Sequence, residues 1–318
     1  MEALTFLIVL CGIFVGWGIG ANDAANCLGT SVGAGLLNYK KAAWIVGILV
    51  FIGAAVQGKA TMKTMGSGIV DATLLTDVSI IAILLSAALL VLVFTIFSLP
   101  ISTTQAVIGG IAGISVMLHA SANWAMVGKI FILGFGTTLM AAVIGFIIYK
   151  AYYKLLSGRS FLVVERVLGW AVLLSGAFLA YSLGANNIGN AMGLVVGKEI
   201  MTALIAGVIG GLAISIGSVT LGSRVMKTIG NDITPLNAPM AFAAQASAGI
   251  SVYILTIFGI PTSITFGIVG AVAGVGMVQG VSSVEKRTVR NIMLGWFATP
   301  LIGAVAAPLI FLLLKIII

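Results

Sequence analysis

Two short clusters of amide and carboxyl side chains occur in this chain with the same spacing. Gly20–Asn26 reads GANDAAN, and Gly184–Asn190 reads GANNIGN. Both clusters lie inside long apolar runs, where charged and amide groups are costly and seldom occur without a function. Carboxylate and amide oxygens are suitable ligands for a hard cation. A duplicated polar cluster of this kind indicates a transporter.

The composition is that of a polytopic membrane protein. Of the 318 residues, 60% are hydrophobic and only 8% are charged, and the mean hydropathy is +1.23. These values exclude an ordinary soluble domain. The 41 glycines predict close helix packing and broken helices. Because the start of the chain has no basic flank or small-residue cleavage site, we expect the first apolar run to remain as a span.

The net charge of +8 is best explained by membrane topology. The basic residues are scattered among short loops without an aromatic-interleaved patch, so no nucleic-acid partner is expected. The positive-inside rule predicts both termini outside and residues 150–166 in the cytoplasm. Lys198 and Glu199 are expected to pair at a loop. The three basic groups behind this prediction are Lys40 and Lys41; Lys150, Lys154, Arg159 and Arg166; and Lys286, Arg287 and Arg290.

The similarity between the two clusters extends along most of the chain. Met62–Gly66 resembles Met226–Gly230, and Thr95–Ser102 resembles Thr256–Ser263. The spacing between the two copies changes by only a few residues from one pair to the next, a change that a loop can absorb. The chain is therefore predicted to consist of two related halves.

The charges of equivalent loops predict that the halves are inverted. The loop at 119–124 has no basic residue, whereas its counterpart at 284–290 has three, so these loops are expected on opposite sides of the membrane. Inverted repeats place binding sites near the midplane, at discontinuous helices. The predicted organisation is a first inverted repeat at 1–150, a cytoplasmic connector at 151–166 and a second inverted repeat at 167–318.

Segment lengths predict an all-α fold with discontinuous helices and re-entrant hairpins. Residues 3–37 as one helix would extend ~52 Å, against ~30 Å of hydrocarbon. A break between Gly20 and Asn26 resolves the mismatch, leaving a span at about 4–20, and the same argument predicts a break between Gly184 and Asn190 within 167–197. Further spans are expected at 42–58, 79–99, 124–150, 200–220, 240–260 and 291–317, with shorter pieces at 101–118 and 262–280.

Hydroxyl side chains follow a proline at the start of each shorter piece. Pro100 and Pro261 cannot continue a preceding helix, and the hydroxyls after them can cap a new one. A helix that begins there presents N–H groups to an anion. The hydroxyls concerned are Ser102, Thr103 and Thr104 in the first half, and Ser263 and Thr265 in the second.

On these motifs the chain resembles the inorganic phosphate transporters (PiT), a family of sodium- or proton-coupled carriers. The matching residues are Gly20–Asn26 with Gly29–Gly33, Gly184–Asn187, Lys63–Gly66, Pro100–Thr104 and Pro261–Ser263. The resemblance spans nearly the whole chain. It implies a multi-pass symporter of the plasma membrane that imports inorganic phosphate.

The resemblance also implies which residues bind. No cofactor is implied beyond the coupling cation, Na⁺ with H⁺ as the alternative. The expected substrate-binding residues are Asn22, Asp23, Ser102, Thr103, Thr104, Asn186, Ser263 and Thr265. The expected cation ligands are Asn22, Asp23, Asn26, Asn186, Asn187 and Asn190.

Two departures from the family pattern leave the substrate and the ion open. Asn187 stands where relatives commonly have Asp, and Gln105 and Phe266 stand where many have His. Losing a negative charge should reduce the number or affinity of bound cations. Sulfate is the main alternative substrate, because related sulfate permeases deviate at these motifs. A retained carboxylate at Asp23 favours phosphate, which near neutral pH can still donate a hydrogen bond.

Simpler roles remain open for these residues. The amides can satisfy backbone groups freed at a helix break, and the serines and threonines can act only as caps. An enzyme is not expected, because no metalloprotease, nucleophile-elbow or phosphate-loop motif occurs. An anion channel is a weaker alternative. The sequence leaves open whether the chain forms a homodimer.

Overall fold

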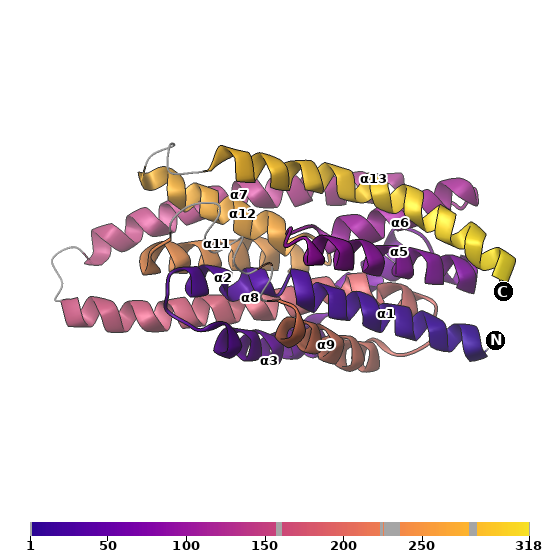
Figure 1. Cartoon of the computed structure of the whole chain (residues 1–318), viewed down its shortest axis with the longest axis horizontal. Helices are drawn as coiled ribbons and strands as arrows, with labels where there is room; N and C mark the ends of the chain where they lie inside the picture. Colours follow the sequence, from indigo (N-terminus) through magenta and orange to yellow (C-terminus); the bar gives the residue numbers. More distant parts are fainter. Residues whose placement is uncertain (1, 157–160, 223–224, 226–235, 280–284, 318) are drawn as a thin grey trace.

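The protein is a bundle of long helices running along one axis, as the computed structural model shows (Figure 1). The structure describes residues 2–156, 161–222, 225, 236–279 and 285–317. These residues are all helix, turn or loop, and no strand occurs among them. The expected all-α membrane fold is confirmed.

Eight segments of the described residues are long and apolar enough to cross a membrane. They correspond to the eight predicted spans, with ends that differ by a few residues. Two shorter apolar helices, α6 (Thr103–Met117) and α12 (Ile264–Gly276), lie where the short pieces were predicted. The segments that contain the spans are α1 (Glu2–Asn22) with α2 (Ala25–Gly33), α3 (Tyr39–Gln57), α5 (Asp77–Ile96), α7 (Trp124–Leu156), α8 (Phe161–Gly197), α9 (Ala203–Thr220), α11 (Ala238–Ile257) and α13 (Lys286–Ile317).

Smaller elements connect the long helices. After α3 the chain forms α4 (Lys59–Lys63), a π-helical turn (Thr64–Gly68) and a 3₁₀ turn (Ala72–Leu74). Another 3₁₀ turn, Met277–Gln279, follows α12. The repeat motif Met226–Gly230 lies outside the described residues, and the division into inverted repeats stays a prediction.

The first polar cluster interrupts its helix, as predicted. At Asp23 and Ala24 both backbone N–H groups reach the carbonyl of Ile19, and the N–H of Asn26 then bonds the carbonyl of Asp23. The regular hydrogen-bond pattern of the helix is therefore interrupted within four residues, where α1 ends and α2 begins. The first six residues of α2, Ala25–Thr30, are all buried.

The second cluster does not interrupt its helix, so the predicted break between Gly184 and Asn190 is wrong. The α8 helix runs without a gap through all 37 of its residues. The length argument failed because the excess length extends past the bundle at the end where α7 and α8 approach each other (Figure 1). Helices that protrude from a bilayer need not break inside it.

Glycine serves close packing in both clusters. A Cβ atom at Gly20 would overlap the carbonyl oxygen of Ile214 in α9, and one at Gly184 would overlap that of Val50 in α3. Each glycine thus lets a neighbouring backbone approach the polar cluster directly. This is the usual role of small residues between membrane helices.

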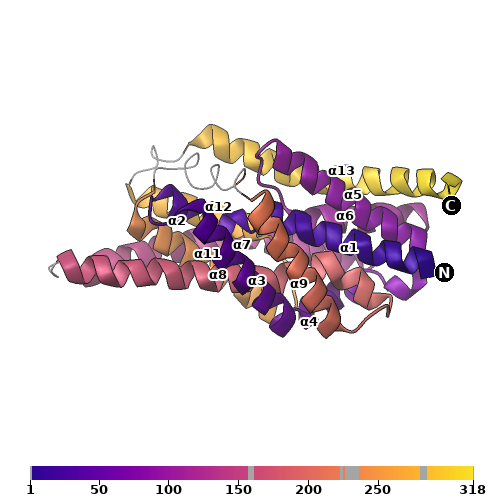
Figure 2. The same ribbon diagram turned by 60° about the horizontal axis from the view of Figure 1, so that its bottom comes forward.

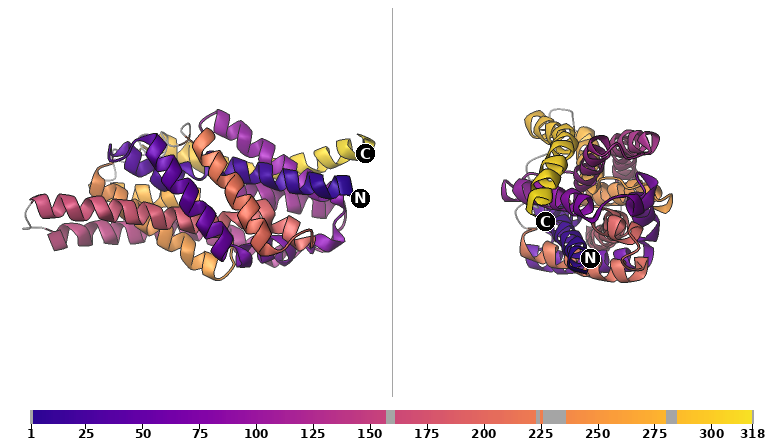
Figure 3. Two further views of the ribbon diagram at one scale, coloured as in Figure 1. Left: turned by 90° about the horizontal axis from the view of Figure 1, so that it is seen from below. Right: turned by 90° about the vertical axis from the view of Figure 1, so that its right-hand side faces the viewer.

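Both described ends of the chain lie at one end of the bundle, and the end of α7 and the start of α8 lie at the other (Figures 1 and 3). This agrees with the expectation that the termini share one side of the membrane and the connector occupies the opposite side.

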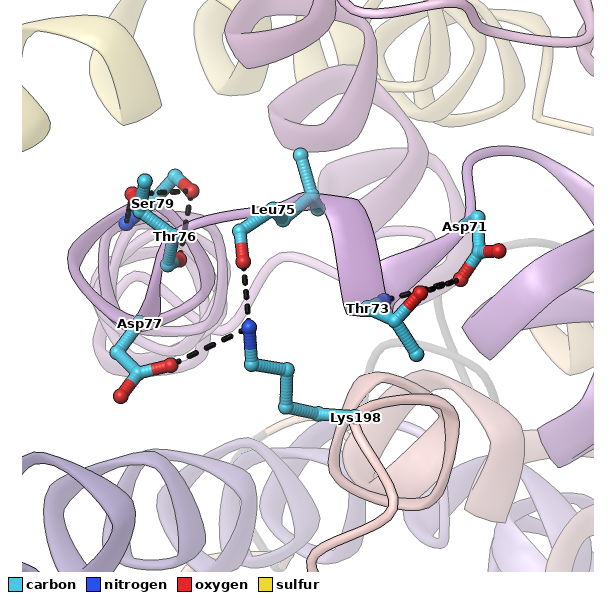
Figure 4. A network of polar contacts seen from close by, with 7 residues as sticks. All are labelled: Asp71, Thr73, Leu75, Thr76, Asp77, Ser79 and Lys198. Carbon is cyan, nitrogen blue, oxygen red and sulfur yellow. Dashed lines mark hydrogen bonds and ion pairs between the residues drawn. The ribbon is translucent and has the colours of Figure 1, made fainter. Parts of the chain in front are cut away.

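Lys198 lies near the end of the bundle that holds the termini. It was expected to pair with Glu199, and this pairing is wrong. Its Nζ instead lies 3.4 Å from Asp77 Oδ1 and donates to the Leu75 carbonyl at 2.6 Å (Figure 4). Glu199 has a φ of 62°, in the left-handed conformation that ends α8.

Candidate functional site

The two hairpins, α5–α6 and α11–α12, are each held by the first asparagine of a polar cluster. Asn22 donates to Thr95 Oγ1 at 2.9 Å and to the Leu99 carbonyl at 3.1 Å, and its Oδ1 accepts from the N–H of Ile101 at 3.1 Å. These bonds satisfy backbone groups that Pro100 leaves outside any helix. Asn22 therefore holds the turn between α5 and α6.

Asn186 makes the equivalent bonds in the second half. It donates to the Thr262 carbonyl, and its Oδ1 accepts from the N–H of Thr262 and from Thr256 Oγ1, both at 3.2 Å. Its Nδ2 also donates to Asn187 Oδ1 at 2.6 Å. The oxygens of Asn22 and Asn186, predicted as ligands, are thus already accepting hydrogen bonds from the hairpins.

The last asparagine of each cluster bonds a threonine of the other half. Asn26 Nδ2 donates to Thr265 Oγ1 at 3.0 Å, and Asn190 Nδ2 donates to Thr104 Oγ1 at 2.9 Å. Those threonines in turn donate to main-chain carbonyls: Thr265 to Ile101 at 3.0 Å and Thr104 to Thr262 at 3.1 Å. These crossed bonds bring together the two clusters and the two hairpins.

Asp23 lies among these residues and is 1% exposed. Its Oδ2 accepts from Thr103 Oγ1 at 2.9 Å and from Asn187 Nδ2 at 2.8 Å, and Thr265 Oγ1 lies 3.3 Å from its Oδ1. In the part of the chain that the structure describes, the recorded ion pair is elsewhere, between Lys198 and Asp77. A carboxylate buried without a counter-charge is costly, so this group requires a cation or a proton.

Two amide oxygens of the polar clusters have no hydrogen-bond partner among the described residues. They are Oδ1 of Asn26 and Oδ1 of Asn190, both fully buried. A buried unsatisfied acceptor costs about 1–3 kcal/mol unless something donates to it or coordinates it. Asn26 bonds the Thr265 hydroxyl, which lies 3.3 Å from Asp23 Oδ1, and Asn190 is one helical turn from Asn187, which bonds Asp23 Oδ2. Carboxylate and amide oxygens are ligands that suit a hard cation such as Na⁺.

Ser102 and Ser263 cap the two short helices. The Ser102 Oγ accepts from the N–H of Gln105 at 3.2 Å, and the Ser263 Oγ accepts from the N–H of Phe266 at 3.4 Å. Each hydroxyl still has its own hydrogen to donate. Capping and anion binding are therefore compatible at these two residues.

Phe266 and Gln105, at the two positions where the family resemblance led us to expect histidine, have different surroundings. Phe266 packs on Trp296 with a centroid distance of 4.1 Å and on Phe135 with 5.1 Å. Gln105 is buried, and its Oε1 has no partner among the described residues. Phe266 thus belongs to an aromatic cluster beside the site and offers no polar group to it.

Several residues of this arrangement are absent from the expected ligand list. Thr95 and Thr256 hold the asparagines that tie the hairpins, and both occur in the repeated Thr95–Ser102 and Thr256–Ser263 motifs, so a signal existed. Gln245 of α11 was missed, because it belongs to no repeated motif and its partners are distant in sequence.

Gln245 links α2 to α11 and α8. Its Nε2 donates to Thr30 Oγ1 at 2.8 Å and to Ser31 Oγ, and its Oε1 accepts from Ser175 Oγ of α8 at 3.0 Å. All four side chains are buried. Gln245 therefore fixes the half-helix that carries Asn26.

These features define a multi-pass membrane protein with a buried polar site at helix breaks, the class to which ion-coupled carriers belong. The chain is a member of the phosphate transporter family, whose family model matches residues 19–307. It is 30% identical to a protein of Pyrococcus abyssi provisionally named a phosphate permease, over 100% of this chain and 99% of that protein. A similarly named protein of Thermococcus kodakarensis is 29% identical over 100% and 99%.

A solved structure has the same fold. It is described as the sodium-dependent phosphate transporter, and it superposes with a TM-score of 0.91 over 99% of this chain and 100% of that chain, at 24% identity. The predicted family is therefore confirmed. For a multi-pass member of this family the plasma membrane is the expected location.

Proposed function

We propose that this protein is a symporter that imports inorganic phosphate together with a cation, with Na⁺ as the coupling ion. Membership of the phosphate transporter family supports this function, and the names of the relatives agree with it. The observation that carries the proposal is the buried Asp23 carboxylate, which belongs to the same hydrogen-bond network as the unpartnered amide oxygens of Asn26 and Asn190.

In this proposal the cation binds to Asp23, Asn26 and Asn190, with Asn187 positioning the carboxylate through its bond to Oδ2. Asn22 and Asn186 contribute by holding the hairpins in place. A cation at this position offsets the charge of Asp23 and lowers the cost of bringing an anion into the membrane core. Substrate and ion then enter together, which is the physical basis of coupling.

The oxyanion binds at the starts of α6 and α12. The N-terminal N–H groups of a helix favour an anion, and hydroxyls of Thr103, Thr104 and Thr265 line the same region. Ser102 and Ser263 donate their O–H groups from the caps. Both helices start next to Asp23, because Thr103 and Thr265 contact its carboxylate.

Phosphate suits this site better than sulfate. Unpartnered acceptors in this region include the oxygens of Asn26, Asn190 and Gln105. Monohydrogen and dihydrogen phosphate carry an O–H that can donate to such an acceptor, whereas sulfate at neutral pH carries none. Burying an anion with no hydrogen to donate would leave these acceptors dependent on cations alone.

The function is tested by uptake into proteoliposomes. Labelled phosphate and labelled sulfate are each supplied under a sodium gradient, a proton gradient or neither. We expect saturable phosphate uptake that requires the sodium gradient. Proton-driven uptake would mean that the coupling ion is H⁺, and sulfate-selective uptake would mean that the substrate is sulfate. Gradient-independent flux that does not saturate would indicate a channel.

A further inference from the structure

A membrane-facing groove lies between α3 and α9, on the exposed faces of the two helices that pack against the polar clusters. Figures 2 and 3 show these helices side by side on the surface of the bundle. The groove has a volume of about 390 Å³, which is within the range of sites that hold organic ligands. Because both helices are membrane spans, the groove opens at the depth of the lipid chains.

The groove has a floor of small residues and walls of large ones. Gly47 and Ser215 form part of the floor, and Trp44, Ile48 and Ile216 stand beside it. These three large side chains are 62%, 57% and 57% exposed. The shape is therefore a trough with apolar sides that no described element covers.

The hydroxyls in the groove already have partners. Ser215 Oγ donates to the Gly47 carbonyl at 2.6 Å, joining the two helices. Thr220 Oγ1 donates to the Ile216 carbonyl at 3.0 Å and accepts from Trp17 Nε1 at 3.0 Å. With its polar groups satisfied, the groove gives water no bonding partner and favours a hydrocarbon chain.

Positive charge occurs at one end of the groove. Lys40 and Lys41 are exposed in the first turn of α3, one helical turn before Trp44, so they lie along the face that leads into the trough. The opposite end begins with Leu204 and Ile205 of α9, which are exposed and uncharged. Neither α3 nor α9 contains Asp or Glu.

We propose that the α3–α9 groove binds one anionic phospholipid, with an acyl chain in the trough and the headgroup phosphate at Lys40 and Lys41. Trp44 lies between the two, at the depth where tryptophan marks the interface. Since the basic residues are predicted on the cytoplasmic side, the lipid belongs to the inner leaflet, where anionic lipids attract basic residues. This site does not depend on the transported substrate.

The proposal is tested by native mass spectrometry of delipidated full-length protein titrated with an equal mixture of phosphatidylglycerol and phosphatidylcholine. We expect one phosphatidylglycerol to be retained with a preference of roughly tenfold. The double substitution Lys40→Gln with Lys41→Gln should abolish the preference. The matched control, Lys150→Gln with Lys154→Gln, removes the same charge from the same side and should keep it.

A second variant tests the trough itself. Ile216→Trp places a larger side chain in the groove from an exposed position, so the variant should no longer retain the lipid. The variant protein should melt in detergent at the same temperature as the wild type. Equal retention of both lipids by the wild type, or an unchanged preference in the Lys40 and Lys41 variant, would overturn the proposal. So would a dimer in which a second copy shields the groove from lipid.

Discussion

Asp23 is the carboxylate at the centre of the proposed cation site. It is buried, it accepts from Thr103 and Asn187, and its charge has no basic partner among the described residues. Asp23→Asn keeps the size of the side chain but removes the charge, so we expect normal insertion and a loss of coupled uptake of roughly 10- to 100-fold. Uptake and detergent-solubilised melting temperature measure the two effects.

The matched control for this substitution is Asp71→Asn. Asp71 is an exposed acid that bonds Thr73 in a loop away from the site. Its neutralisation should leave uptake unchanged. Near-wild-type uptake by Asp23→Asn would remove the role assigned to that carboxylate.

Asn187 determines how much negative charge the site holds. Its Nδ2 lies 2.8 Å from Asp23 Oδ2, so Asn187→Asp places two carboxylates in contact. Two such groups cannot both ionise without an additional cation or a shared proton. We expect a higher Hill coefficient for sodium in the uptake assay. Asn187→Ala, which removes the donor and adds no charge, should not raise it, and equal sodium dependence of the two variants would contradict the prediction.

Ser102 and Ser263 test whether the caps also bind the anion. Ser102→Ala and Ser263→Ala should each raise the half-saturation concentration for phosphate severalfold, because each removes one hydroxyl donor. Loss of an N-cap alone costs about 1 kcal/mol of stability, which a melting experiment measures separately. If both variants melt earlier with an unchanged half-saturation concentration, the serines are caps only.

Among the elements, α2 is the half-helix that needs an external partner to hold its position. Gln245→Leu leaves the hydroxyls of Thr30, Ser31 and Ser175 without this partner, so we expect a loss of about 1–3 kcal/mol in stability. Because α2 carries Asn26, the half-saturation concentration for sodium should also rise. The uptake assay with varied sodium measures this second effect.

Ser251→Ala is the control on the same helix. The Ser251 Oγ is buried and has no hydrogen-bond partner among the described residues, so its removal should not lower the stability. A Gln245→Leu variant that is destabilised but keeps its sodium dependence would show that Gln245 supports the fold without positioning the site.

The helices were largely predictable from the sequence, but their continuity was not. Apolar run lengths and Pro100 and Pro261 located the spans and the two short helices, since these signals are local. The motif at Gly184 resembles the one at Gly20, yet only the first interrupts its helix. Because the two local sequences are similar, packing against the neighbouring helices decides whether the helix is interrupted. That packing cannot be read from the sequence.

The site was predictable as a set of residues and not as a set of bonds. Repetition identified Asp23 and the asparagines, and the hydroxyls after each proline identified the threonines. The division between hairpin ties at Asn22 and Asn186 and unpartnered oxygens at Asn26 and Asn190 depends on which atoms meet in space. Gln245 was missed for the same reason, because its partners are distant in sequence.

At the scale of the whole molecule, the positions of the loops at the two ends of the bundle predict one orientation of the protein in the membrane. The loop containing Ser121 is expected outside, and Leu155 at the end of α7 is expected in the cytoplasm. In cells, an impermeant maleimide should label Ser121→Cys directly and Leu155→Cys only after permeabilisation. The native Cys11 and Cys27 are buried and give little background. Labelling of both variants in intact cells would contradict the arrangement.

The crossed bonds from Asn26 to Thr265 and from Asn190 to Thr104 make the centre of this chain an interface between two pieces. Neither piece alone contains both partners of either bond. If the gene were split between α7 and α8, each fragment would lose most of its packing partners, because α1 and α3 pack on α9, and α6 and α7 pack on α13 and α12. We therefore expect neither fragment to be stable until it meets the other, and the covalent link supplies the two interlocked pieces in equal amounts.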